Sequence, residues 1–322
     1  MLFNLLVRKI MFSLTLYGSR FKKRIIACLM GVFLAPPAFA EGSIVNISTR
    51  SPIEVIPENI MYTGFVIAGT GSKQVYIRAI GQGLRPLGIS TSLNPRIVIV
   101  NATTGAMIAS NDDWGSGPWV DQINNLPFGT FAYAPPPSFS DAAMILDLTA
   151  GAYIAKVIPF NGNTVGVGIV AIDDIGGPST AKLVNISTRS PVRQGAENYM
   201  YGGFIVVDAP KKFFVRAIGK GLRALGVDTL LDPLMEIYDQ TAQKTIASND
   251  SWALDSSASE LPDLFRTKNG ITPDASDAGM VICLKPGVYS PVIKPMGGSS
   301  GVGIVAVDDL GDCVEPTLSM FR

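Results

Sequence analysis

The heptad "NISTRSP" occurs twice in this chain, at Asn46–Pro52 and again at Asn185–Pro191. The two copies start at positions 46 and 185, and each begins a longer duplicated segment. Downstream, "VYIRAIGQGLRPLG" corresponds to "FFVRAIGKGLRALG", "IASNDDW" to "IASNDSW", and "GVGIVAIDDIG" to "GVGIVAVDDLG". The spacing between copies changes by only a few residues from the first motif to the last. The sequence therefore predicts two tandem copies of one folding unit, at residues 41–177 and 178–322.

Within each copy the hydrophobic pattern is that of β-strands. Residues 73–80 and 211–218 alternate in polarity and are rich in β-branched and aromatic side chains. The stretch "RIVIVNATTGAMIASND" predicts a hairpin with its turn at Thr104–Gly105. Strand-like segments recur every 8–12 residues with Gly, Asn and Pro between them, as in sandwiches and barrels. We expect an all-β protein with two tandem jelly-roll-like antiparallel β-sandwich domains, in which the heptad forms a first edge strand that ends in a turn.

Residues 1–40 have the pattern of a secretory signal peptide. Basic residues at 22–24 precede an apolar run over 25–35, and the segment ends in the small-x-small sequence Ala38–Ala40. The apolar run is too short for a spanning helix, so no membrane span is expected after cleavage. Residues 1–20 are either a long n-region or the result of a start codon assigned too early. The predicted location is outside the cell or at its surface, with the periplasm as the alternative.

The chain contains no histidine. Ser-His-Asp and Cys-His nucleophiles and the common imidazole-based metal sites are therefore excluded. The residues after position 40 include 20 basic and 26 acidic side chains, a net charge of −6 that disfavours nucleic-acid binding. An Asp/Glu hydrolase remains a distant alternative. Matching carboxylates in both copies, such as Asp141 and Asp277, instead favour a structural role, and we do not expect an enzyme.

Taken together, the motifs resemble a repeat found in secreted and surface proteins of environmental bacteria. They are "NISTR", "GGFIV", "VRAIGKGLRALGV", "LDPLMEIYDQ", "IASNDSW", "GVYSPVI" and "GVGIVAVDD". The latter half also resembles the bacterial pre-peptidase C-terminal domain, a jelly-roll-like β-sandwich attached to secreted hydrolases. Neither family brings a catalytic centre of its own, so the resemblance implies an accessory role, in some members with calcium.

The resulting expectation is a non-catalytic, adhesion-type protein that contacts a polysaccharide or an extracellular or surface protein. A purely structural subunit of a surface assembly is the alternative. The oligomeric state is left open by the sequence.

Two loops rich in short oxygen-bearing side chains are candidate calcium sites. The first Asn-Asp loop contains Asn111, Asp112 and Asp113, and the second contains Asn249 and Asp250. Calcium takes six to eight oxygen ligands, which such side chains supply. The D-x-D-x-D-G spacing is absent, so Asx-turns are the alternative interpretation. No other cofactor is expected.

Two residue types that recur in both copies suit structural roles. Trp114 and Trp252 close the Asn-Asp loops and are predicted to cap the core, with stacking on sugar rings as the alternative. Arg78 and Arg216 are predicted to pair with a carboxylate, such as one from the "DD" sequence near the end of each copy.

The second copy contains two cysteines, Cys283 and Cys313, without counterparts in the first. Cys283 replaces Asp147, which is predicted to point outward from an alternating strand. Cys313 follows the last predicted strand. Export permits disulfide formation, and a bridge would tie the C-terminal segment to the sandwich. The sequence predicts a Cys283–Cys313 disulfide, with two free thiols as the alternative.

Overall fold

The structure is a computed structural model that describes residues 42–127, 134–162, 164–176 and 179–313. The predicted signal peptide and the boundary between the units at 177/178 lie outside the described residues. Within these ranges the fold is predominantly β and forms a sandwich, as predicted. No helix in this part of the chain is both long and apolar enough to cross a membrane.

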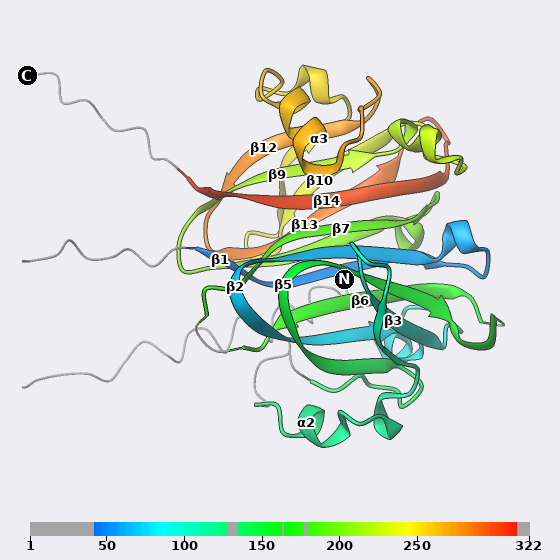
Figure 1. The fold of residues 1–322 in the computed structure, drawn as a ribbon. Helices are drawn as coiled ribbons and strands as arrows, with labels where there is room; N and C mark the ends of the chain where they lie inside the picture. Colours follow the sequence, from blue (N-terminus) through cyan, green and yellow to red (C-terminus); the bar gives the residue numbers. More distant parts are fainter. Residues whose placement is uncertain (1–41, 128–133, 163, 177–178, 314–322) are drawn as a thin grey trace, which may run out of the picture.

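The strands of the first repeat are β1 (Ser43–Ile53), β2 (Met61–Ile80), β3 (Pro95–Asn101), β4 (Met107–Asn111), β5 (Ala142–Pro159) and β6 (Gly166–Asp174). Those of the second are β7 (Lys182–Val192), β8 (Met200–Val207), β9 (Lys211–Ile218), β10 (Pro233–Asp239), β11 (Lys244–Asn249), β12 (Ala278–Leu284), β13 (Gly287–Pro295) and β14 (Gly301–Asp312). Short helices α2 (Val120–Asn124) and α3 (Leu261–Asn269) lie at opposite ends of the molecule (Figure 1). The 3-10 turns η2 (Gln82–Leu87) and η7 (Lys220–Leu225) follow the "RAIG" strands, and η6 (Ala196–Asn198) follows β7.

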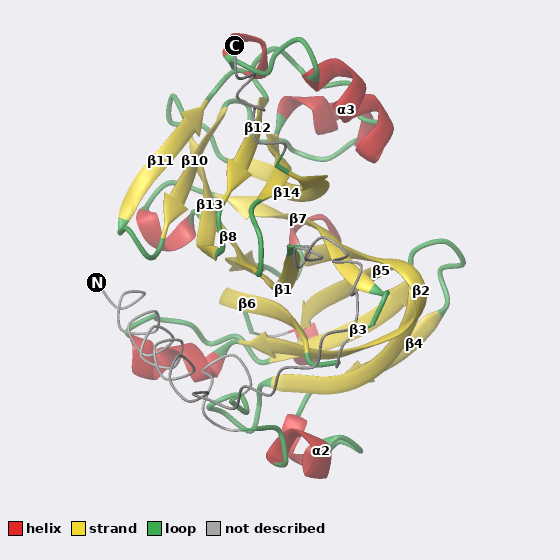
Figure 2. Ribbon diagram, turned by 90° about the vertical axis from the view of Figure 1, so that its left-hand side faces the viewer, coloured by secondary structure: helices red, strands yellow, loops and turns green. Residues whose placement is uncertain are grey.

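The strands form two layers, and each layer runs from one repeat into the other (Figure 2). One layer has the order β4-β3-β5-β2-β7-β14-β9-β12, and the other has β11-β10-β13-β8-β1-β6-β2-β5. The long strands β2 and β5 belong to both layers because each is irregular near its middle and pairs on both sides of that point. A single hydrophobic cluster consequently extends through both repeats.

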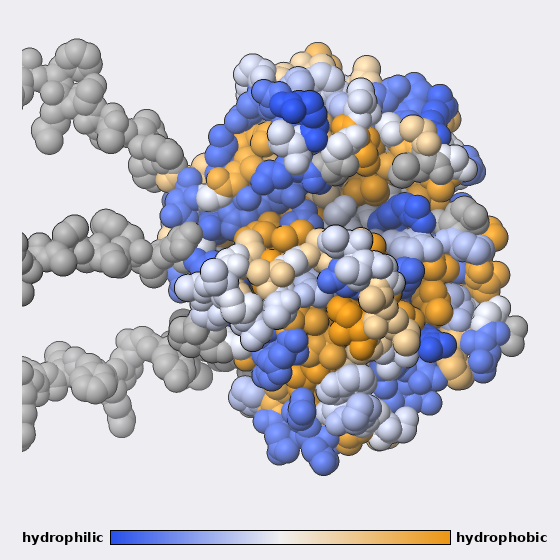
Figure 3. All heavy atoms as spheres, in the orientation of Figure 1, coloured by the Kyte–Doolittle hydropathy of each residue, from blue (hydrophilic) through white to orange (hydrophobic). Residues whose placement is uncertain are grey.

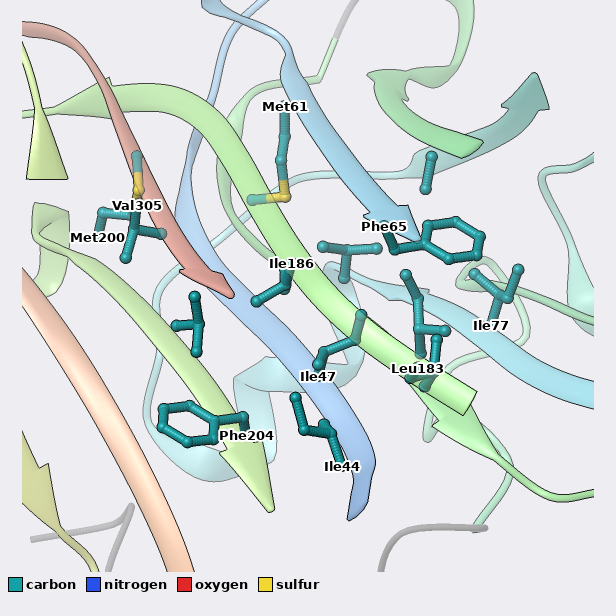
Figure 4. Close-up of a cluster of buried hydrophobic side chains, with 14 of the residues drawn as sticks. Ile44, Ile47, Met61, Phe65, Ile77, Leu183, Ile186, Met200, Phe204 and Val305 are labelled. Atoms are coloured by element: carbon teal, nitrogen blue, oxygen red, sulfur yellow. The ribbon is translucent and has the colours of Figure 1, made fainter. Parts of the chain in front are cut away.

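The heptad strands β1 and β7 lie in the middle of these layers, so the prediction of edge strands was wrong. β1 pairs with β6 of its own repeat and β8 of the other, while β7 pairs with β14 and with β2. Ile44 and Leu183, which occupy equivalent positions in the two copies, face each other. Their neighbours Ile47 and Ile186 enter the shared core (Figure 4). The two repeats are thus related by an approximate two-fold axis, which we call the repeat dyad.

Two local features follow from glycine and proline. The predicted hairpin is confirmed: β3 and β4 pair antiparallel, and Gly105 in their turn has a positive φ of 70°. Residues 142–174 hold two strands, β5 and β6, and β5 continues through Gly151. In the second repeat the corresponding run is divided into β12 and β13 beside Pro286, which has no N–H for the ladder.

The predicted disulfide between Cys283 and Cys313 is confirmed, with a Cα–Cα distance of 5.9 Å. Cys283 is exposed on β12, and Cys313 comes directly after β14. These two strands flank β9, so the bridge closes over the start of that strand. The backbone N–H of Cys313 also donates to the carbonyl of Pro210, at 3.4 Å. The end of the last strand is therefore attached to the sandwich covalently.

Candidate functional site

A buried arginine–aspartate pair occupies the interior of each repeat, as the sequence predicted. Arg78 Nη2 lies 2.6 Å from Asp173 Oδ2, and Arg216 pairs with Asp308. The heptad supplies a further partner, because Asn46 Nδ2 donates to the other oxygen of Asp173 at 2.6 Å, and the second repeat has the same arrangement. Further hydrogen bonds help to offset the desolvation of a buried ion pair, although Arg78 Nε is buried without a hydrogen-bond partner among the described residues. These charges therefore hold three strands together.

A second buried carboxylate in each repeat binds the glycine turn of the "RAIGxG" motif, a role that sequence reasoning missed. Asp141 Oδ1 accepts from the N–H of Gly81 at 2.8 Å, and Oδ2 accepts from Gly83 at 3.2 Å. A Cβ on Gly83 would collide with this carboxylate, which explains the glycine. Burial raises the pKa of Asp141, and these amide donors partly oppose the rise. Asp277 binds the equivalent turn in the same way.

The two Asn-Asp loops have the hydrogen bonds of turns. Asn111 Oδ1 accepts from the N–H of Ala143 at 2.9 Å, and its Nδ2 donates to the carbonyl of Asp113 at 3.2 Å. Asn249 makes the same two bonds in the second repeat. Among the described residues, no three Asp, Glu, Cys or His side chains gather where they could hold a metal ion. Calcium binding by Asn111, Asp112 and Asp113, and by Asn249 and Asp250, stays a prediction.

The loop tryptophans cap the core. Trp114 is 8% exposed, its indole N–H donates to the carbonyl of Ser138 at 2.9 Å, and its ring stacks on Phe139. Trp252 donates to the carbonyl of Asp274 at 3.0 Å and packs edge-on against a core phenylalanine. The predicted core-capping role is confirmed for both rings.

Buried hydroxyl groups join the two repeats at the dyad. Thr49 and Thr188, equivalent residues of the two heptads, place their Oγ1 atoms 2.7 Å apart. Ser51 donates to the carbonyl of Pro191 at 2.6 Å, and its counterpart Ser190 donates to that of Pro52 at 2.9 Å. The two serine hydrogen bonds are reciprocal: each repeat donates one to the other. The heptad is repeated because both copies of it build one interface.

Arginines of the heptads extend this interface to the surface. Arg50 stacks on Tyr201 with its Cζ 4.0 Å from the ring centroid, and Arg189 stacks on Tyr62 at 4.4 Å. Among the described residues neither arginine forms an ion pair within 4 Å, although Arg50 donates to the carbonyl of Ala196 at 3.2 Å. Burial lowers the pKa of Arg50, and the nearby tyrosine and Glu197 oppose that effect.

The symmetry is broken at Glu54 and Arg193, which occupy equivalent positions of the two repeats but carry opposite charges. Arg193 Nε donates to Glu54 Oε1 at 2.9 Å, and Asn59 donates to the other carboxylate oxygen at 2.7 Å. Two identical repeats would bring like charges together here. The ion pair therefore favours pairing of the first repeat with the second.

A groove lies beside this ion pair, between the two repeats. It consists of two adjoining hollows that share residues 88–90 and 165–166: one of about 450 Å³ lined by both repeats, and one of about 600 Å³ lined by the first repeat. The end of β1, the turn after η2, the start of β6 and the segment leading into η6 form its walls. We call it the boundary groove. Its lining contains three arginines against two glutamates, in a chain whose charge from residue 41 onward is −6.

The second repeat differs at the place related by the dyad. There the N–H of Leu230 donates to the carbonyl of Val302 at 2.9 Å, and the N–H of Val302 donates to the backbone carbonyl of Asp228 at 2.8 Å. These bonds join the turn after η7 directly to β14. Asp228 also stands where the first repeat has Ser90. The two repeats therefore present different chemistry at equivalent places, which the duplicated motifs alone did not reveal.

Comparison with known proteins gives no family assignment. No family model matches the chain, and no curated protein matches it. Among solved structures, the atomic structure of Sulfolobus Turreted Icosahedral Virus is similar at a TM-score of 0.18 and 11% identity, covering 83% of this chain and 61% of that one. A triple jelly roll protein of an archaeal virus turret assembly gives a TM-score of 0.19 and 10% identity, covering 84% and 57%. The chain thus spans about three fifths of the length of these structures, and at such TM-scores the likeness carries no argument about its fold or activity.

Proposed function

We propose that this is an exported, non-catalytic β-sandwich protein of the cell surface or extracellular matrix that acts by binding. The observation that carries the proposal is the use of its buried charged groups. Asp141, Asp173, Asp277 and Asp308 are each bonded within the fold, and equivalent residues do the same in both repeats. A general acid or base needs a carboxyl group that can reach a substrate, whereas these four stabilise strands and turns.

The surface supports a binding role over a catalytic one. In the described part of the chain the two hollows are lined by hydroxyl, amide, arginine and aliphatic side chains together with Glu54, which is paired with Arg193, and Glu197, and no cluster of metal-binding groups lies there. Apolar patches on the face shown in Figure 3 lie between hydrophilic ones. The resemblance to accessory repeats of secreted bacterial proteins points the same way.

The test uses the purified chain from residue 41 onward. We expect binding to intact cells or to isolated surface polysaccharide and matrix fractions, together with no turnover on hydrolase substrates. Substitution of Asp141 and Asp277 separates the alternatives, because a hydrolase would lose turnover with them. Hydrolysis that disappears with either substitution would contradict the proposal.

A structural assembly subunit is the second candidate, and one strand edge favours it. β4 pairs only with β3 among the described strands, and it exposes Met107 and Ile108 by 65% and 42%. The equivalent edge strand β11 has Lys244, a charged residue of the kind that discourages edge pairing. Self-association that disappears in Met107→Lys, measured by light scattering, would support this candidate. A monomeric parent protein would exclude it.

A further inference from the structure

We propose that the boundary groove binds a carboxylate-bearing polysaccharide segment, such as a run of uronic acid residues. This inference rests on the proposed binding function and assigns a site and a ligand class to it. The groove lies between two structural units, which is where ligand sites commonly form. Its combined hollows are large enough for a short oligosaccharide segment.

The three arginines of the groove outnumber its two carboxylates, Glu54 and Glu197, which favours a ligand of negative charge. Arg193 is already neutralised by Glu54. Arg50 and Arg85 form no ion pair within 4 Å in the described part of the chain, and Arg85 is held by donation from its Nε to the carbonyl of Thr91 at 2.8 Å. The terminal nitrogens of Arg85 thus remain at the exposed rim. A guanidinium group binds a carboxylate through parallel charge-assisted hydrogen bonds.

The remaining lining suits a sugar. Ser90 presents an exposed hydroxyl side chain, and the exposed Ser92 hydroxyl, which donates to the carbonyl of Val165 at 2.8 Å, can still accept a hydrogen bond. Ile89 and the 46%-exposed Val165 offer apolar surface to the C–H groups of a ring. A peptide strand would need a free sheet edge for its backbone. In this lining β1 pairs with β6 through residues 50–53 but with β8 only up to Arg50, and the short edge left at residues 51–53 contains Pro52, which has no N–H to donate to an added strand. Side-chain recognition of a glycan therefore fits better than strand addition.

The second repeat provides a built-in contrast. It replaces Ser90 by Asp228, whose charge repels an anion, and it joins its turn to β14 by hydrogen bonds. Arg189 and Arg223, the counterparts of Arg50 and Arg85, do not line the boundary groove. The place related by the dyad therefore lacks this combination of residues, and we expect one ligand per chain.

The experiment is calorimetric titration of the oxidised chain with a hexamer of galacturonic acid and with its methyl ester, which keeps the sugar but removes the charge. We expect one site per chain, weaker binding at higher salt, and at least about tenfold weaker binding of the ester. Ser90→Asp, which transfers the residue of the second repeat to an exposed position, should weaken binding about tenfold. The matched control Asp228→Asn should bind as the parent does.

Arg85→Ala provides an independent variant, with Arg223→Ala as its control. Equal affinity of Ser90→Asp, Arg85→Ala and the parent would overturn the assignment of the site. Equal binding of hexamer and ester, or competition by hexaglutamate at equal concentration, would overturn the ligand class. Absence of any hexamer binding would refute the inference but leave the proposed function standing, because that function is judged by attachment and turnover assays.

Discussion

Exchange of the charges of Glu54 and Arg193 tests the repeat dyad directly. The single changes Glu54→Arg and Arg193→Glu each replace an attractive pair by two like charges. The double variant restores an attractive pair, with the positive charge at position 54 and the negative charge at position 193. The dyad even supplies a partner for the new carboxylate, because Asn198 near position 193 is the counterpart of the Asn59 that binds Glu54. A genuine two-fold relation therefore predicts that the double variant recovers most of the lost stability.

The magnitude follows from the exposure of the pair. The Glu54 and Arg193 side chains are 27% and 38% exposed, so solvent screens the interaction and it contributes about 0.5–1 kcal/mol. Repulsion in a single variant adds a similar amount, which gives a loss of about 1–2 kcal/mol. The double variant should return to within about 0.5 kcal/mol of the parent. Urea unfolding of the four proteins as a double-mutant cycle measures this. Additive losses in the double variant would refute the reasoning.

Reduction of the Cys283–Cys313 bridge, or its replacement by two serines, should destabilise the protein by about 3–4 kcal/mol, because the bridge closes a loop of about 30 residues; equal melting of both forms would argue against this. Burial raises the pKa of Asp277, so its contribution to stability is full below about pH 4 and decreases as pH rises through the folded-state pKa. The stability of the parent relative to Asp277→Asn, from urea unfolding at pH 4 and pH 7, should accordingly fall with rising pH, and a constant difference would contradict the assignment. If the two Asn-Asp loops hold calcium, millimolar calcium raises the melting temperature and a chelator lowers it; identical melting under both conditions would discard that prediction.

Features that lie within one repeat were accessible from the sequence. The all-β pattern, the β3–β4 hairpin and the outward position of Cys283 all depend on local alternation. The pairing of Arg78 with an aspartate could be inferred because both residue types recur in both copies. The attachment of Asp141 to Gly81 and Gly83 was also within reach, since the glycine pair and the acid recur together.

Features that depend on the partner of a strand were not accessible. Alternation along the heptad shows that one face is buried, and it looks alike for an edge strand and a central one. The partners of β1 include β8, which lies in the other repeat. The boundary groove could not be predicted from the sequence for the same reason, because residues of both repeats line it. The aligned copies do show that Ser90 is replaced by Asp228. The sequence alone does not show that this position lines a groove, because that depends on residues distant in the chain.

The crossing of β1 and β7 between repeats has a consequence for how the chain is made. Ile47 finds its neighbour Phe204 across the β1–β8 ladder only after the second repeat has been synthesised. Until then one edge of β1 and one edge of β2 have no partner, and such edges invite pairing with other chains. Contacts of this sequence separation also make folding slow. We therefore expect the newly made first repeat to be prone to aggregation until the chain has been synthesised to residue 207, the end of β8.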